Sequence, residues 1–313
     1  MALAVVAGGY KGRRGIPFLK PKISVVINTL NEENDLPNAI KSVIPWADEV
    51  VVVDQHSDDR TVEIARSLGA TVYMHERTGC VEPVRKFAVE QCTGEWVLIL
   101  DADEMVSKEL SDLLVALADP AKTASSPGPP TAYRIPRENY LCGRLMSGSG
   151  WAAEDDLMLR FFPKGALVFS GRIHDGAHPA AGTTVVDIPY IPGRALVHFS
   201  YIGVADFINR LNRYTSEEVF NHPDDRPTKA KTFRRALREF YKRYYRRKGY
   251  RDGWQGLYLA LAMSFYKIAT DAKAVERQAG GVEAARDTYR AVAAQVLDEY
   301  VDATTADKRN DSS

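Results

Sequence analysis

The chain has 313 residues, of which 45% are hydrophobic and 26% are charged, with 41 Lys and Arg against 41 Asp and Glu. This length and apolar fraction allow one large or two modest domains with a buried core, and they exclude a disordered or low-complexity chain. The zero net charge argues against a general nucleic-acid binder. The charges are nevertheless segregated, because residues 23–120 carry a net charge of −12 and residues 231–251 a net charge of +9.

The cysteines and the apolar runs indicate the compartment. Cys80, Cys92 and Cys142 are widely spaced and form no Cys-X-X-Cys pair, so neither a disulfide framework nor a zinc cluster is expected. The basic residues near the start follow the short apolar run, the reverse of the order in a secretory signal. The apolar run 257–269 falls short of the roughly 20 residues that span a bilayer. We therefore expect a reduced, cytoplasmic protein.

Residues 23–100 show alternating signals for strands and helices. Strands are predicted at 23–28, 49–54, 70–74 and 95–100. Helices are predicted after the cap residue Asn34 or Asp35, at 61–68 and at 84–91. Strands that alternate with helices at this spacing pair in parallel, so we expect an open α/β sheet flanked by helices. Ligands of such sheets bind at the carboxyl ends of the strands.

The second half of the chain has a different pattern. Further strands are predicted at 132–136, 157–162, 166–170 and 195–199, and they suit a smaller mixed sheet. From residue 204 onward the pattern is helical, so we expect a helical C-terminal extension.

Acidic residues of the first half stand where predicted strands end. Asp54 closes the second strand, and the sequence Asp101-Ala102-Asp103-Glu104 follows the fourth. Two carboxylates in an Asp-X-Asp turn are able to share a hard divalent cation such as Mg²⁺ or Mn²⁺, which would stabilise a diphosphate leaving group. Taken alone, the same pattern also fits a solvated loop or a helix cap.

Much of the chain resembles a known enzyme family. Segments 23–36, 46–70 and 84–104 resemble family 2 glycosyltransferases of the GT-A fold. Within that family the chain looks most like the branch of lipopolysaccharide-core β-1,4-glucosyltransferases. The closer likeness rests on segments 133–144, 150–162, 171–179, 196–201 and 209–219.

The resemblance implies a role for individual residues. A nucleotide sugar would contact residues at the strand ends and on the helix before the fourth strand: Thr29, Asn31, Glu32, Asp54, Ser57, Arg85, Lys86, Asp101, Ala102 and Trp151. Asp103 would bind the metal directly, with His174 as a second ligand or a substrate contact.

Structural roles are the alternatives for several of these residues. Asp54 also fits a plain turn, only one of Arg85 and Lys86 need face the site, and Trp151 also fits a core anchor. Glu104 would support the site or begin a helix. A lone His is more often structural, and we prefer that role for His178 and His198.

An inverting transfer needs a base that deprotonates the acceptor hydroxyl. The cluster Glu154-Asp155-Asp156 offers the candidates. In the branch that the chain resembles, an aspartate stands four residues before an Arg-Leu-Phe, and Asp156 stands four before Arg160. This favours Asp156 with Asp155 second, although one extra residue before them leaves the register open.

The basic segment 231–251 has aromatic and aliphatic residues at helical spacing. Basic amphipathic helices of this kind bind anionic membrane interfaces. The resemblance also implies a peripheral membrane anchor that serves a lipid-linked acceptor, on the inner face of the cytoplasmic membrane. The alternative is an ordinary helix whose cations face water, and nucleic acid is not expected as a partner.

Together these features predict a metal-dependent, inverting glycosyltransferase. It would move a sugar from a nucleotide donor, with UDP expected, to a hydroxyl of a lipid-linked, saccharide or small-molecule acceptor. The expected organisation is an N-terminal extension (1–22), a GT-A catalytic domain (23–203) with a nucleotide-binding half (23–119) and an acceptor half (132–203), and a helical, basic region (204–313). The alternatives are a sugar-nucleotide pyrophosphorylase, whose glycine-rich N-terminal loop is missing here, and a non-catalytic scaffold of the same fold.

Overall fold

The computed structural model describes residues 21–78, 82–119, 131–169, 176–222 and 226–310. The chain divides into two compact units, which are described separately below. The first unit comprises Met1–Glu138 and Asp156–His198, and the second comprises Asn139–Asp155 and Phe199–Ser313. The chain passes from one unit to the other three times: within β6 (Thr131–Leu141), between Asp155 and Asp156, and within β12 (Leu196–Tyr201).

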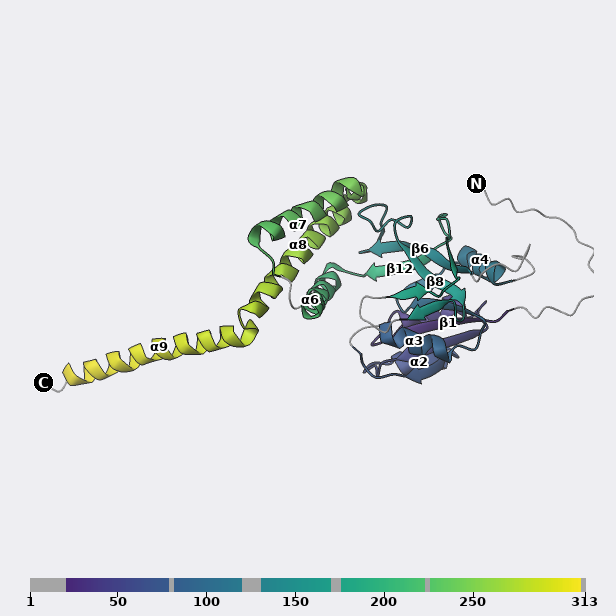
Figure 1. Ribbon diagram of the computed structural model, residues 1–313. Helices are drawn as coiled ribbons and strands as arrows, with labels where there is room; N and C mark the ends of the chain where they lie inside the picture. Colours follow the sequence, from purple (N-terminus) through teal and green to yellow (C-terminus); the bar gives the residue numbers. More distant parts are fainter. Residues whose placement is uncertain (1–20, 79–81, 120–130, 170–175, 223–225, 311–313) are drawn as a thin grey trace, which may run out of the picture. The chain divides into compact units, whose positions relative to one another are not determined.

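The first unit begins with alternating strands and helices, as predicted (Figure 1). Its elements up to the Asp-X-Asp turn are β1 (Ile23–Thr29), α1 (Leu36–Val43), β2 (Glu49–Asp54), α2 (Thr61–Ser67), β3 (Thr71–Met74), α3 (Glu82–Gln91) and β4 (Trp96–Asp101). β1 pairs in parallel with both β2 and β4, and β2 pairs in parallel with β3. The predicted α/β class with a mostly parallel sheet is therefore confirmed.

Helices cover both faces of this sheet because side chains of a strand alternate between its faces. In β1 the buried side chain of Ile27 joins a core with Leu36 and Ile40 of α1, whereas Val26 joins a second core with Val84 of α3. All residues of β1 are buried, which accounts for the three consecutive β-branched residues at its centre, Val25, Val26 and Ile27.

The sheet continues beyond β4 with strands from later in the chain. The order is β3-β2-β1-β4-β8-β6-β12-β5, with β8 antiparallel to both β4 and β6. The remaining elements of this part are β5 (Glu104–Val106), α4 (Lys108–Ala118), β8 (Leu157–Pro163), β9 (Leu167–Phe169), β10 (Ala177–Pro179) and β11 (Thr184–Asp187). β5 was not predicted, and its antiparallel pairing with β12 connects the Asp-X-Asp turn to a segment more than 90 residues later.

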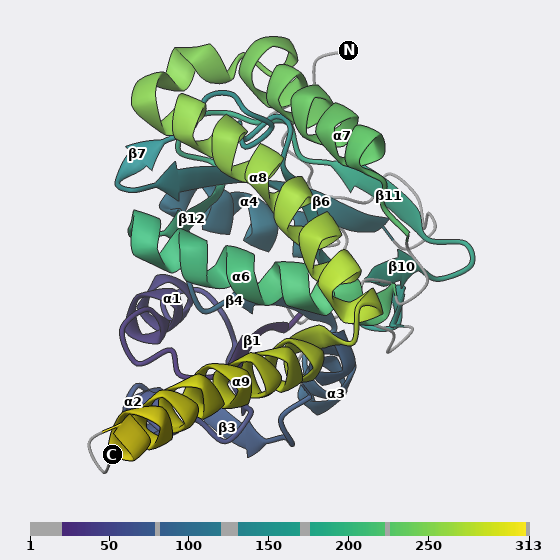
Figure 2. The ribbon, with the colours of Figure 1, turned by 90° about the vertical axis from the view of Figure 1, so that its left-hand side faces the viewer.

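The second unit is mainly helical. It contains β7 (Arg144–Leu145), α6 (Val204–Asn221), α7 (Lys229–Tyr241), a π-helical turn (Lys242–Arg246), a 3-10 turn (Gly249–Asp252), α8 (Gly253–Gln278) and α9 (Gly281–Asn310). Figure 2 shows α8 with α6 on one side and α7 on the other. Leu141, Phe207, Leu211 and Leu259 form its core. Among the described residues, no helix is both long and apolar enough to cross a bilayer.

Candidate active site

The ends of β1 and β2 are joined through Asp54. Its side chain is fully buried, and its carboxylate accepts hydrogen bonds from Thr29 Oγ1 at 2.9 Å, Ser57 N at 2.8 Å and Ser57 Oγ at 2.6 Å. Asp54 therefore holds the two strand ends together. Its contact with a nucleotide base remains a prediction.

The loop after β1 is tied to the loop after β2 by several further hydrogen bonds. The backbone N–H of Asn31 donates to Ser57 Oγ at 2.8 Å, and the Asn31 side-chain oxygen accepts from Asp58 N at 2.7 Å. The backbone N–H of Glu32 donates to Thr61 Oγ1 at 2.8 Å. The structure thus brings together all five residues that were expected at these strand ends, namely Thr29, Asn31, Glu32, Asp54 and Ser57.

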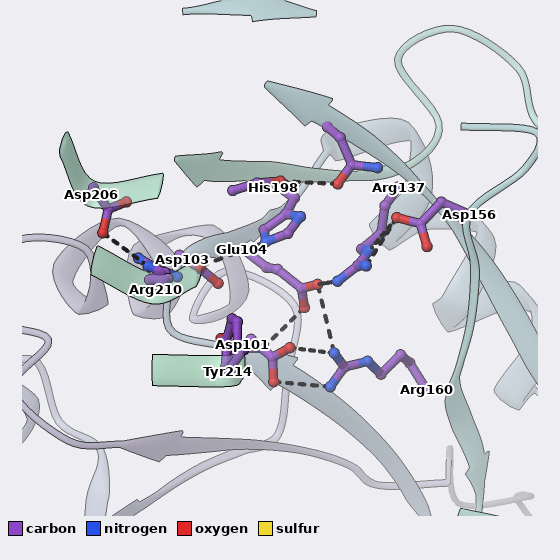
Figure 3. A network of polar contacts seen from close by, with 12 residues as sticks. Asp101, Asp103, Glu104, Arg137, Asp156, Arg160, His198, Asp206, Arg210 and Tyr214 are labelled. Carbon is purple, nitrogen blue, oxygen red and sulfur yellow. Dashed lines mark hydrogen bonds and ion pairs between the residues drawn. The ribbon is translucent and has the colours of Figure 1, made fainter. Parts of the chain in front are cut away.

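Asp101, at the end of β4, is held by two arginines (Figure 3 shows the pair with Arg160). Arg85 of α3 donates to Asp101 Oδ1 at 2.9 Å, and Arg160 of β8 donates to both carboxylate oxygens, to Oδ1 at 3.0 Å. Burial would raise the pKa of Asp101, but the charges of Arg160 and Arg85 outweigh it and hold that pKa well below its usual value.

Of the two basic residues on α3, only Arg85 faces the Asp-X-Asp turn. The side chain of Lys86 is 59% exposed and lies 3.9 Å from Glu90 on the same helix. The Arg85 Nε is buried and has no hydrogen-bond partner among the described residues. Arg85 is therefore the better candidate for a diphosphate contact.

Asp103 lies beside His198. The distance between Asp103 Oδ2 and His198 Nε2 is 3.5 Å, and both side chains are less than 20% exposed (Figure 3). The pair is formed because His198 of β12 stands opposite Glu104 of β5, the residue that follows Asp103. A carboxylate oxygen and an imidazole nitrogen are suitable ligands for Mn²⁺, with donor phosphates and water completing its shell. The described residues contain no group of three or more His, Cys, Asp or Glu side chains that would bind a metal without such help.

Glu104 is a buried link between the turn and Asp156. Its side chain is fully buried, and it accepts from Asp101 N at 3.0 Å and from Arg137 of β6 at 3.0 Å. Arg137 also donates to Asp156 Oδ2 at 3.0 Å. Glu104 therefore supports the site and does not begin a helix, since α4 starts at Lys108.

Three further predicted residues are Trp151, Asp155 and His174. Trp151 and Asp155 belong to the second unit, where the ring of Trp151 stacks on Tyr201 at 5.7 Å and Asp155 is exposed. His174 lies outside the described residues. Ala102, the middle residue of the turn, is buried and has no polar side chain to offer, so only its backbone is available to a ligand.

Arg137 and Arg160 were not predicted as site residues, and His198 was predicted to be structural. Arg160 had a usable signal, because a single charge inside the apolar strand 157–163 requires a buried partner. His198 and Arg137 carried no such local signal. Their partners are set by the register of β5 with β12 and by hydrogen bonds between distant segments.

Several known proteins to which this chain is similar are glycosyltransferases. The family model described as glycosyl transferase family 2 matches residues 24–182. An uncharacterized glycosyltransferase of Rickettsia typhi is 31% identical over 63% of this chain and 67% of its own length. The lipopolysaccharide core biosynthesis glycosyltransferase LpsC of Rhizobium meliloti is 28% identical over 83% of this chain and 94% of its own.

Similarity to solved structures is more limited. A crystal structure of glucosyl-3-phosphoglycerate synthase from Mycobacterium tuberculosis, in complex with Mn²⁺, UDP and glucosyl-3-phosphoglycerate, is 26% identical with a TM-score of 0.30. The match covers 36% of this chain and 43% of that one, so it spans less than half of the solved structure.

Proposed function

Because the chain belongs to glycosyl transferase family 2, we propose that it transfers a sugar from a nucleotide donor, with UDP as the nucleotide, to a hydroxyl group of its acceptor. The observation that carries the proposal is the convergence of three features at the ends of the strands. These are the linked β1 and β2 loops, the Asp-X-Asp turn with His198 beside it, and Asp156 connected to that turn through Arg137.

Each of these features would have its own role in the proposed reaction. The loops around Asp54 would hold the nucleotide, and Arg85 would contact the diphosphate. Asp103 and His198 would hold Mg²⁺ or Mn²⁺, which supplies charge stabilisation for the departing diphosphate. Asp156 would accept the proton of the acceptor hydroxyl as its oxygen bonds to the anomeric carbon and the bond from that carbon to the diphosphate breaks, with inversion.

A thermal-shift panel of nucleotide sugars, with and without Mn²⁺, tests this proposal. We expect a UDP-sugar with Mn²⁺ to raise the melting temperature most, because a ligand that binds only the folded state adds about 2.7 kcal/mol of stability at 100 times its Kd. A larger rise with a free nucleoside triphosphate would support a pyrophosphorylase instead. No rise with any nucleotide would support a scaffold protein.

The Asp103→Asn substitution tests the metal site. We expect kcat to fall about 100-fold, as when one transition-state contact is removed, and the effect of Mn²⁺ on donor-induced melting to disappear. Asp112→Asn is the matched control, since Asp112 is an exposed acid of α4 paired with Lys108. Activity that survives both Asp103→Asn and a chelator would rule out the metal role.

The second unit presents a surface that fits a lipid-linked acceptor. Along α7 and the π-helical turn, four apolar or aromatic side chains are each more than half exposed and lie four residues apart. We call Phe233, Leu237, Tyr241 and Tyr245 the aromatic stripe. Arg234 and Arg238 are exposed next to it, and neither has an ion-pair partner within the part of the chain that the structure describes. Exposed aromatic side chains beside unpaired cations favour an anionic membrane interface.

The double substitution Arg234→Gln and Arg238→Gln tests membrane contact. Each cation near an anionic surface contributes about 1 kcal/mol, so we expect binding to phosphatidylglycerol-containing vesicles to weaken about 30-fold in a sedimentation assay. The matched control is Arg286→Gln with Arg290→Gln, also four residues apart on an exposed helix but paired with Glu283 and Asp287. Equal binding by both double variants would argue against this surface.

A further inference from the structure

Arg137 lies between two carboxylates that belong to different parts of the site (Figure 3). Its Nη1 donates to Glu104 Oε1 at 3.0 Å, its Nε donates to Asp156 Oδ2 at 3.0 Å, and its Nη2 lies 2.9 Å from the same oxygen. The Arg137 side chain is 15% exposed, that of Asp156 is 21% exposed, and Glu104 is fully buried. One planar guanidinium therefore connects the buried acid after the Asp-X-Asp turn with the proposed base.

Both ends of this connection are anchored by the backbone. Glu104 also accepts from the backbone N–H of Asp101, which binds it to the turn itself. Arg137 donates its own backbone N–H to the carbonyl oxygen of Asp156 at 3.1 Å, so backbone and side chain of Arg137 hold the same residue. Arg137 therefore contacts both the backbone and the side chain of Asp156.

The charges around Arg137 keep it ionised. Burial and the nearby charge of Arg160 would lower the pKa of Arg137. The negative charges of Glu104 in β5 and of Asp156, just before β8, outweigh these effects, so the pKa is raised. Arg137 is therefore a permanent cation, and its planar fork matches two carboxylates in a way that a lysine ammonium does not.

We propose that Arg137 is a positioning residue, which sets the place of the Asp156 carboxylate relative to the Asp-X-Asp turn. This inference rests on the proposed function, with Asp156 as base. Proton transfer requires the base within hydrogen-bond reach of the acceptor hydroxyl while the donor is held at the turn, and a displacement of 1 Å costs on the order of 100-fold in rate. Arg137 fixes that relation through Glu104 and Asp156 without itself touching the substrate.

Steady-state kinetics of Arg137→Met and Arg137→Lys test the proposal. We expect kcat to fall about 100-fold in Arg137→Met, with the KM for the nucleotide sugar changed less than about twofold because donor contacts are intact. Arg137→Lys keeps the charge but not both bonds, and we expect it to recover about tenfold of that loss. Arg134→Met is the matched control on the same strand, because Arg134 pairs with the exposed Asp187, and it should leave kcat unchanged.

The same substitutions in an Asp156→Asn background distinguish positioning from a general structural effect. If Arg137 acts through Asp156, Arg137→Met adds less than about threefold to the loss in Asp156→Asn. A full multiplicative loss, an unchanged kcat in Arg137→Met, or a raised KM with unchanged kcat would each overturn the proposal. Should Arg137→Met fail to fold, the tenfold deficit of Arg137→Lys and its disappearance with Asp156→Asn serve the same purpose.

If the proposed function itself is wrong, the experiments give different results. In that case the wild-type chain would transfer no sugar from any nucleotide donor, or Asp156→Asn alone would retain wild-type kcat. Both results are obtained before any Arg137 variant is made. A wild-type chain that is active and depends on Asp156, but is indifferent to Arg137, refutes only the positioning role.

Discussion

Asp156→Asn is expected to lower kcat for sugar transfer by about 10²- to 10⁴-fold, the range for removal of a general base. The asparagine amide has nearly the shape of the carboxylate, so its oxygen can still accept from Arg137, while its ability to take a proton is lost. The KM for the nucleotide sugar should change little, because the proposed base acts on the acceptor. The measurement is initial-rate kinetics in which the donor concentration is varied at saturating acceptor and metal.

Asp155→Asn is the control for this prediction. Asp155 is exposed in the second unit, whereas Asp156 is part of the buried network of the first. We therefore expect Asp155→Asn to retain most of the activity. If Asp155→Asn loses activity and Asp156→Asn does not, Asp155 is the base. In that case Arg137 does not position the base.

Arg160→Met is expected to have the largest effect on stability. Arg160 is 3% exposed and contributes two hydrogen bonds to Asp101, with a further contact to Glu104 at 3.7 Å. Removing one partner of a buried ion pair costs about 3 kcal/mol. In Arg160→Met the Asp101 carboxylate, which is 30% exposed, would keep only its contact with Arg85. The free energy of unfolding, measured by urea titration followed by circular dichroism, should fall by about this amount.

The loss of unfolding free energy in Arg160→Met should become smaller as the pH falls. The pKa of Asp101 is held below its ordinary value in the folded chain, so its contribution to stability is complete above that ordinary value and is lost as the pH falls toward the folded pKa. The difference between Arg160→Met and wild type should therefore narrow below about pH 4 in metal-free buffer. Arg60→Met is the control, since Arg60 and Glu63 form an exposed pair that solvent screens and that contributes little to stability. A difference that stays constant with pH would contradict this account.

The first half of the fold was predictable from the sequence because its signals are local. The apolar run of β1, the closing acids of β2 and β4, and the helices between them follow from hydrophobic pattern and turn residues. The observed bounds differ from the predicted ones by at most two residues. A parallel sheet brings its strand ends to one edge, so the meeting of Asp54 with Thr29 followed from topology.

The choice between similar candidates needed the structure. The sequence left open which of Arg85 and Lys86 faces the Asp-X-Asp turn, and the packing of α3 decides for Arg85. Trp151 was expected at the nucleotide site and Asp155 as the second candidate base; both belong to the second unit, and their roles stay predictions. The side chains of neighbouring residues in a helix or loop point in different directions, and these directions cannot be read from the amino-acid composition.

The sequence by itself thus determined the α/β class, the position of the acidic strand ends and the basic, aromatic character of α7, since each depends on neighbouring residues. Only the tertiary structure decided that His198 lies beside Asp103, that Arg160 neutralises Asp101 and that Arg137 joins Glu104 to Asp156. These contacts join residues that are 19 to 95 positions apart in the sequence. The antiparallel pairing of β5 with β12 and of β8 with β4 brings these residues together. Strand register is set by long-range packing that no single segment encodes, and a shift of one residue would reverse which side chains meet.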